Sequence, residues 1–256
     1  MNSLIKLFFC IKLAKMSDSI VIIPTYNEIE NIENIVRAVF SLKKSFDILI
    51  VDDNSPDGTS TKILELEKEF PNQLFLEKRA KKSGLGTAYV HGFKWSLAHH
   101  YEYIFEMDAD FSHNPLDLEK LYEACHTHDA DLAIGSRYIT GVNVVNWPLN
   151  RVLMSYFASV YVRFITRMQI MDTTAGFVCY KRKVLQSINL DKIKFIGYAF
   201  QIEMKYRAYA KNFNIVEVPI IFTDRAKGQS KMSGSIIKEA VFGVISLRLK
   251  KLMWRL

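Results

Sequence analysis

Residues 103–110 read Tyr-Ile-Phe-Glu-Met-Asp-Ala-Asp, an apolar run that ends in two carboxylates on alternate positions. Such a run is typical of a strand buried on both faces of a parallel sheet. A strand rising about 3.3 Å per residue would direct Asp108 and Asp110 to the same side. Because Mg²⁺ and Mn²⁺ prefer oxygen ligands, the pair is a candidate site for a metal-bound pyrophosphate. An Asp pair in this position also serves in turns and as a helix cap.

Strands and helices alternate on both sides of this stretch. Strands are predicted at 20–23, 47–51, 74–77, 130–134, 176–180 and 215–222. Helices are predicted at 28–42, near 60–70, at 84–98, 152–168 and 199–210. The alternation predicts an α/β fold with a mostly parallel, doubly wound sheet and right-handed crossovers.

Three polar loops follow predicted strands, at 24–28, 52–59 and 108–115. In an open α/β sheet, ligands bind outside the carboxyl ends of the strands, so we expect these loops to converge on one site. Asp52 and Asp53 could also cap the helix that follows them. Gly84 and Gly86 lack the third glycine of a dinucleotide fingerprint, and no GxxxxGK[ST] loop is present. Dehydrogenase, kinase and ATPase functions are therefore not supported.

Length and composition predict one large domain with a full core, since the chain has 256 residues, 49% of them hydrophobic. Its three cysteines have neither disulfide-framework nor zinc-ligand spacing, which favours a reducing cytosol. The net charge of +7 is concentrated at residues 225–256, where eight basic residues face one acid. No run reaches the 18 to 20 or so uncharged apolar residues that a membrane span needs. We therefore expect no membrane-spanning segment.

Six motifs occur in one order along residues 19–237: PTYNE (24–28), VDDNSPDGT (51–59), GLGTAY (84–89), MDAD (107–110), GSRY (135–138) and DRAKGQSKM (224–232). Together they resemble the dolichol-phosphate mannosyltransferases, family 2 glycosyltransferases of the GT-A fold. The resemblance implies an inverting transfer of mannose from GDP-mannose to a polyprenyl phosphate. It also implies Mg²⁺ or Mn²⁺ as cofactor.

The resemblance assigns roles to individual residues. Those implied to hold the guanosine are Pro24, Tyr26, Glu28, Val51 and Asp53. Asp108, Ala109 and Asp110 would address the ribose, the pyrophosphate and the metal. Ser112 would join the metal shell at a position that is often Gln in archaeal members, and a hydroxyl is a weaker ligand. Arg137, Arg225 and Lys231 would bind the phosphates of donor and acceptor, joined at the acceptor by Arg151.

The implied chemistry needs arginine rather than histidine. A phosphate acceptor is already anionic near neutral pH, so it attacks without a general base and requires placement and charge balance. Arginine presents a planar fork to phosphate and stays protonated. We therefore expect surface or helix positions, without a catalytic role, for His91, His99, His100, His113, His126 and His128.

Three segments are candidates for a mobile lid or for contact with a membrane. Residues 227–231 are predicted to form a lid over the substrates, or a linker before the last helix. Apolar residues of the C-terminal segment form one stripe with basic neighbours, which suits a helix in a membrane interface or a packing element: Phe242, Ile245, Leu249, Leu252 and Leu256. The helix predicted at 152–168 raises the same alternatives, with a polar side of Ser155, Ser159, Arg163, Thr166 and Arg167.

The predicted organisation is an N-terminal extension (1–16), a GT-A catalytic domain (17–232) and a basic amphipathic membrane-surface helix (233–256). We expect a peripheral enzyme on the cytoplasmic face of the membrane. Family members often carry membrane spans of their own or rely on a membrane-spanning protein partner. One alternative is a family 2 transferase of another sugar nucleotide, such as UDP-glucose. A non-catalytic module that binds nucleic acid through residues 225–256 would leave the Asp108–Asp110 pair unexplained, so no nucleic-acid partner is expected.

Overall fold

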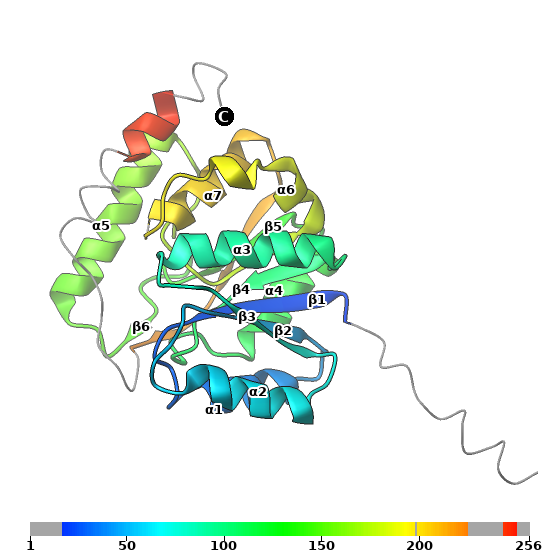
Figure 1. The fold of residues 1–256 in the computed structure, drawn as a ribbon. Coiled ribbons are helices and arrows are strands. Elements are labelled where there is room, and N and C mark those ends of the chain that lie inside the picture. The colour runs from blue at the N-terminus through cyan, green and yellow to red at the C-terminus, as the bar shows by residue number, and fades with distance from the viewer. Residues whose placement is uncertain (1–16, 198, 225–242, 250–256) are drawn as a thin grey trace, which may run out of the picture.

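A computed structural model of the protein describes residues 17–197, 199–224 and 243–249. Within them, a seven-stranded sheet lies between helices on both faces (Figure 1). Its strand order is β3-β2-β1-β4-β7-β5-β8, and β7 runs antiparallel to both of its neighbours. The predicted α/β fold with a mostly parallel sheet is thus confirmed.

The strands of this sheet are β1 (Ser19–Thr25), β2 (Asp47–Asp52), β3 (Leu74–Lys78), β4 (Tyr103–Glu106), β5 (Leu132–Ser136), β7 (Val178–Lys181) and β8 (Ile215–Pro219). A second sheet pairs β6 (Val144–Val145) with β9 (Phe222–Thr223). The helices are α1 (Ile32–Phe40), α2 (Thr59–Glu69), α3 (Leu85–Ala98), α4 (Asp117–His126), α5 (Leu149–Thr166), α6 (Arg182–Ser187) and α7 (Ala199–Ala210). A 3₁₀ turn covers Leu190–Lys192, and residues 243–249 are helical.

Three differences from the predicted elements have local causes. Pro24 lies inside β1, because β4 pairs with β1 only as far as Ile22 and the missing N–H of proline therefore faces no partner strand there. The last predicted strand is divided: β8 ends at Pro219, and Phe222 pairs with β6 instead. Helix α4 was not predicted, since only a few apolar positions mark its inner face.

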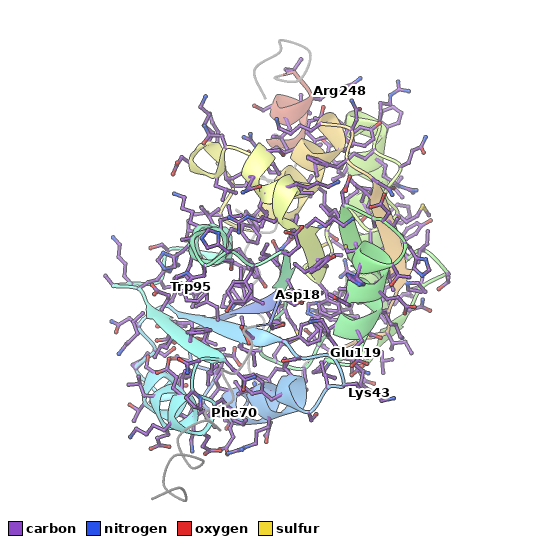
Figure 2. All side chains as sticks on the ribbon, turned by 90° about the vertical axis from the view of Figure 1, so that its right-hand side faces the viewer. Asp18, Lys43, Phe70, Trp95, Glu119 and Arg248 are labelled. Carbon is purple, nitrogen blue, oxygen red and sulfur yellow. The ribbon has the colours of Figure 1, made fainter. Side chains whose placement is uncertain are left out.

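Two apolar layers cover the sheet, and successive residues of each central strand alternate between them. In β1, Ile20 and Ile22 belong to the layer that contains α3 and α7, whereas Val21 and Ile23 face the layer of α1, α2 and α4. Side chains fill the space between the sheet and both layers of helices (Figure 2). Burial on both faces explains why these strands are apolar throughout rather than alternating.

The order of the strands places the candidate site. β1 pairs with β2 on one side and with β4 on the other. The strand order therefore runs from β1 to β3 toward one edge of the sheet and continues with β4 on the other side of β1. The crevice outside the carboxyl ends of such strands is where open α/β sheets bind ligands. The loops after β1, β2 and β4 all leave the sheet at this edge.

Candidate active site

The acidic triplet 108–110 lies in the loop beyond β4, because that strand ends two residues earlier. Loop geometry, and not strand alternation, therefore orients the two carboxylates. Asp110 Oδ1 accepts the backbone N–H of Ser112 at 3.1 Å, and Phe111 turns the chain with a φ of 59°. Asp110 is 7% exposed, while Asp108 is half-buried beside the hydroxyl of Tyr89.

Ser112 and His113 continue this loop into the interior. The hydroxyl of Ser112 is buried and has no hydrogen-bond partner within the described residues. His113 is only 3% exposed and stacks on Phe177 with ring centroids 4.9 Å apart, so the expectation of a surface or helix position is wrong for this histidine. Burial lowers the pKa of His113 to about 4, which makes the neutral ring the form present at neutral pH.

The two aspartates after β2 have different roles. Asp52 is fully buried and accepts hydrogen bonds from the hydroxyls of Thr25 and Ser60, at 2.9 and 2.7 Å, which ties the loop to β1 and α2. Asp53 instead pairs with Arg79, whose Nε lies 2.5 Å from Asp53 Oδ1. Asp53 is therefore the member of the pair that lies with a cationic side chain at the edge of the sheet.

The other residues implied for the guanosine lie around the carboxyl ends of β1 and β2. Tyr26 is half-buried, and Lys82 Nζ lies 4.2 Å from its ring centroid. The carboxylate of Glu28 accepts from Asn31 Nδ2 at 2.9 Å. Pro24 is half-buried, whereas the side chain of Val51 is fully buried in the core. Their roles toward a nucleotide stay predictions.

Arg137 follows β5 and is held by a buried carboxylate. Its Nε and Nη2 donate to the two oxygens of Asp172, each at 2.7 Å, and the side chains of Arg137 and Asp172 are 9% and 0% exposed. Burial alone would raise the pKa of Asp172, but the charge and hydrogen bonds of Arg137 hold it below its usual value. Glu217 Oε1 accepts the backbone N–H of Asp172 at 2.9 Å and fixes the loop that carries it.

Arg151 reaches the same region from the first turns of α5. Its Nη1 pairs with Asp224 Oδ1 at 2.8 Å, and its guanidinium lies 4.0 Å from the ring centroid of Trp147. Arg137 approaches the same indole at 5.5 Å. The two arginines that the sequence assigns to the acceptor thus share one aromatic neighbour.

Strand β9 joins the acidic loop to the arginines. The N–H of Thr223 donates to the carbonyl of Ser112 at 3.2 Å, and the N–H of Asp224 donates to the carbonyl of Val145 at 3.0 Å. The ring of Phe222, in the same strand, contacts both His113 of the acidic loop and the guanidinium of Arg137. The carboxyl end of β4 and the phosphate-binding candidates are therefore connected through direct contacts.

Two predicted phosphate ligands, Arg225 and Lys231, lie outside the described residues, as does the predicted lid at 227–231. Three residues that shape the site were missed: Arg79, Trp147 and Asp172. The signal available was an aromatic residue directly before the Pro148 that caps α5, and an acid within an otherwise uncharged stretch at 168–180. Neither signal identifies the residue with which Trp147 or Asp172 interacts. Asp172, for example, lies 35 residues from its partner Arg137 along the chain.

Residues 20–188 match the model of glycosyl transferase family 2. The chain belongs to this family. Three curated relatives are similar along most of this glycosyltransferase. Polyprenol monophosphomannose synthase of Mycolicibacterium smegmatis is 48% identical over 88% of this chain and 85% of the relative. Undecaprenyl-phosphate mannosyltransferase of Micrococcus luteus is 44% identical over 87% and 90%. Dolichol-phosphate mannosyltransferase of Pyrococcus furiosus is 37% identical over 86% of this chain and 60% of the relative.

Solved structures share the GT-A fold of this glycosyltransferase. Glucosyl-3-phosphoglycerate synthase of Mycobacterium tuberculosis, bound to Mn²⁺, UDP and glucosyl-3-phosphoglycerate, aligns with a TM-score of 0.65 at 15% identity, over 93% of this chain and 80% of that one. A mannosyltransferase of Pyrobaculum calidifontis, bound to GDP-mannose and Mn²⁺, aligns with a TM-score of 0.55 at 13% identity, over 94% and 75%. The similarity confirms the fold class predicted from sequence.

The acidic loop of this glycosyltransferase fits a divalent cation that is shared with a substrate. Among the described residues, no three His, Cys, Asp or Glu side chains are grouped as a closed metal cage. Mg²⁺ sites at phosphates commonly use one or two carboxylates, with substrate oxygens and water completing the shell. Asp108 and Asp110 supply such carboxylates, and the unpartnered hydroxyl of Ser112 is a buried oxygen in the same loop.

Proposed function

We propose that the protein transfers mannose from GDP-mannose to a polyprenyl phosphate with inversion, giving polyprenyl-phosphate β-mannose and GDP. The observation that carries the proposal is the contact of Phe222 with both His113, in the loop of the acidic pair, and Arg137, since it brings the residues proposed for the donor next to one proposed for the acceptor. The names of the three relatives support mannose and a polyprenyl phosphate. The GDP-mannose complex of the Pyrobaculum enzyme supports the donor.

The donor would lie over the carboxyl ends of β1 and β2. Asp53 is fixed by Arg79 and would accept hydrogen bonds from the guanosine, next to the half-buried ring of Tyr26. Glu28 and Pro24 border the same edge, and the buried Val51 would support it from below. These residues would hold the nucleotide while its pyrophosphate extends toward Asp108 and Asp110.

Asp108 and Asp110 would hold Mg²⁺ or Mn²⁺, with Ala109 as the small residue between them and Ser112 as a weaker oxygen donor. A divalent cation bound there offsets the negative charge of the pyrophosphate and of the departing GDP. Since Asp110 already accepts the N–H of Ser112, its carboxylate is held in place before a ligand binds. Asp110→Ala is expected to abolish turnover, and retained activity at saturating metal would contradict the assignment.

The acceptor phosphate would bind at Arg137 and Arg151. It is anionic at neutral pH, so its oxygen attacks the sugar carbon directly while the bond from that carbon to GDP breaks. No proton has to be removed from it, so the step needs no general base. Arg225 and Lys231 would complete the charge balance, and the lid proposed at 227–231 would exclude water.

The outer face of α5 supports a location at a membrane surface. Within the described part of the chain, no helix is long and apolar enough to cross a bilayer. However, α5 turns its small polar residues inward, with Ser159 and Thr166 buried, and exposes large apolar ones: Leu149, Leu153, Met154, Phe157 and Phe164. Such a face beside basic residues suits the headgroup boundary of a bilayer, and we assign the protein to the cytoplasmic surface.

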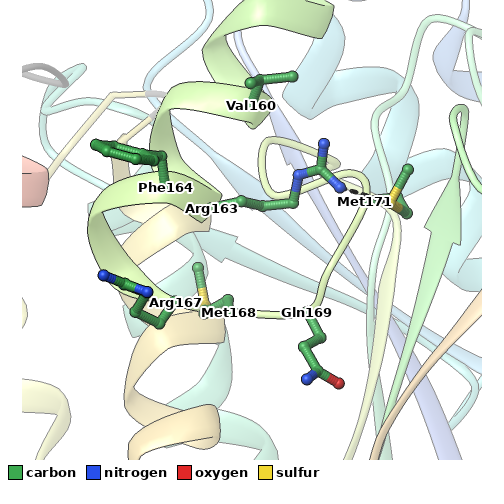
Figure 3. Close-up of a pocket in the computed structure, with 7 residues that line it drawn as sticks. All are labelled: Val160, Arg163, Phe164, Arg167, Met168, Gln169 and Met171. Atoms are coloured by element: carbon green, nitrogen blue, oxygen red, sulfur yellow. Dashed lines mark hydrogen bonds between the residues drawn. The ribbon is translucent and has the colours of Figure 1, made fainter.

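A pocket at the end of α5 fits the same location. It measures about 460 Å³, and two arginines and a glutamine line it together with apolar side chains: Val160, Arg163, Phe164, Arg167, Met168, Gln169 and Met171 (Figure 3). Arg163 is directed toward Met171, while Phe164 projects from a different side of the helix (Figure 3). Cationic and apolar groups side by side match an anionic amphiphile.

The structure describes residues 243–249 of the C-terminal segment, which was predicted to be either a membrane-surface helix or a packing element. This part of the segment has features of both. Val244 and Leu247 are 1% exposed and belong to the core, so this part of the segment packs against the domain. Ile245 and Leu249, of the predicted apolar stripe, are 40% and 52% exposed. Phe242, Leu252 and Leu256 lie outside the described residues. Packing on one side and an exposed stripe on the other are compatible with a helix at a membrane surface.

The test is transfer of radiolabelled mannose from GDP-mannose to a polyprenyl phosphate, with and without Mn²⁺ or Mg²⁺. Metal-dependent labelling of the lipid is expected, and its β-configuration would establish inversion. Transfer from UDP-glucose but not from GDP-mannose would replace the donor and leave the site unchanged. Absence of transfer from either donor would refute the proposal.

A further inference from the structure

The indole ring of Trp147 contacts both guanidinium groups that are proposed to bind the acceptor phosphate. The guanidinium carbon of Arg151 is 4.0 Å from the indole centroid, and that of Arg137 is 5.5 Å from it. Each arginine is also paired with a carboxylate: Arg137 with Asp172 and Arg151 with Asp224. The indole is thus a common neighbour of two ion pairs that come from distant parts of the chain.

Two guanidinium groups that would bind the same phosphate repel each other, and an aromatic ring that contacts both reduces that cost. The negative face of an indole attracts a cation, and Trp gives the strongest such interaction among the aromatic residues. The flat ring also limits the rotation of both side chains. Arginines that are held before the ligand arrives lose less freedom on binding it.

The ring itself is held by the second sheet. Trp147 follows β6, whose partner β9 supplies Phe222, and the rings of Trp147 and Phe222 meet edge to face with centroids 5.2 Å apart. Pro148 caps α5 directly afterwards with a φ of −65°. The indole is therefore fixed by β9, the strand whose Thr223 also contacts the acidic loop.

The indole nitrogen gives a second reason to connect Trp147 with the site. Its N–H is buried and has no hydrogen-bond partner within the described residues. A buried donor without a partner destabilises the folded protein, because it has lost its hydrogen bonds to water. Packing alone would be served at lower cost by phenylalanine or leucine, so the ring at this position does more than fill space.

We propose that Trp147 is a positioning residue that sets the spacing and orientation of Arg137 and Arg151 for the acceptor phosphate. The inference rests on the proposed function, which places these two arginines at that phosphate. Trp147 acts through the arginines, so its effect falls on the acceptor and not on the nucleotide sugar.

The test compares Trp147→Leu and Trp147→Phe with the wild type and with Trp95→Leu as a control on α3. KM for a short-chain polyprenyl phosphate is measured at saturating donor, and GDP-mannose binding is measured by calorimetry. Trp147→Leu is expected to raise the acceptor KM by about tenfold, the phenylalanine variant by less, and neither is expected to change donor affinity. An unchanged acceptor KM, or equal losses for donor and acceptor, would overturn the inference.

A double-mutant cycle with Arg151→Lys separates positioning from a general structural role. If Trp147 acts through Arg151, Trp147→Phe should weaken acceptor binding much less in the Arg151→Lys background than in the wild type. Additive losses would overturn the inference, and this arm stays decisive if the leucine variant fails to fold. Direct calorimetry of the short-chain phosphate needs no turnover. A wild type that binds the phosphate but transfers no sugar would refute the proposed function and leave the role of Trp147 measurable.

Discussion

The exposed face of α5 gives a quantitative prediction about membrane binding. Phe157 and Phe164 are 60% and 74% exposed. A phenylalanine offers about 200 Å² of surface, so the two rings together leave roughly 250 Å² in contact with water. At about 25 cal/mol per Å², complete transfer into lipid would contribute about 6 kcal/mol. A helix lying in the interface realises about half of this, so replacing both rings with serine should weaken partitioning about 100-fold.

The assay is cosedimentation of the full chain with vesicles of phosphatidylcholine and phosphatidylglycerol. The double variant Phe157→Ser/Phe164→Ser is compared with Leu64→Ser, which removes an apolar side chain, 48% exposed, from α2 on the opposite face of the sheet. The control should bind vesicles like the wild type, and turnover of a short soluble acceptor should be retained by both variants. A change of less than about threefold in the double variant would refute the assignment of α5 to the membrane surface.

Three other predictions concern the interior. Asp172→Asn keeps the shape of the side chain but leaves the Arg137 guanidinium buried without its counter-charge, so the free energy of unfolding in urea should fall by about 3–5 kcal/mol; a loss below about 1 kcal/mol would contradict the role of the pair. Gly86→Ala should destabilise by about 1–3 kcal/mol, because the added Cβ would lie 2.7 Å from the carbonyl oxygen of Phe195; an unchanged melting temperature would show that the loop yields. Burial raises the pKa of Asp47 to about 6, so its contribution to stability is complete below the unfolded pKa of about 4 and is lost as pH rises through about 6. Asp47→Asn should remove this part of the pH dependence in urea titrations at pH 4 to 8, and an identical pH profile would refute it.

Most of the strands and helices, though not α4 or α6, could be predicted in order from the sequence because each depends on local periodicity. Ile20–Ile23 and the run before Asp108 are apolar throughout, as strands covered on both faces must be. The polar loops after β1, β2 and β4 could likewise be assigned to one edge of the sheet, since parallel strands end on the same side. The family could be inferred from the six motifs because they occur in one order along the chain. No single motif would have been specific enough.

Pairings between distant residues could not be predicted in this way. Asp172 meets Arg137, and Arg79 meets Asp53, only because separate loops reach the same edge of the sheet. Asp172 stands alone in an uncharged stretch of sequence, but no local signal identifies Arg137 as its partner or Arg79 as the partner of Asp53. The burial of His113 depends in the same way on Phe177 and Phe222, which come from other parts of the chain.

Helix α5 shows most clearly where the sequence stopped being sufficient. Its pattern showed a polar and an apolar side, but the direction of each side is set by what the helix packs against. The domain packs against the side with Ser159 and Thr166: the Ser159 hydroxyl accepts a hydrogen bond from Thr173, and the Thr166 side chain is fully buried. Phe157 and Phe164 are therefore left on the outer side of the helix. The sequence alone therefore determined most of the elements, the motifs and the family. Tertiary structure decided which carboxylate holds which arginine and which face of α5 meets the surroundings, because both depend on contacts between residues far apart in the chain.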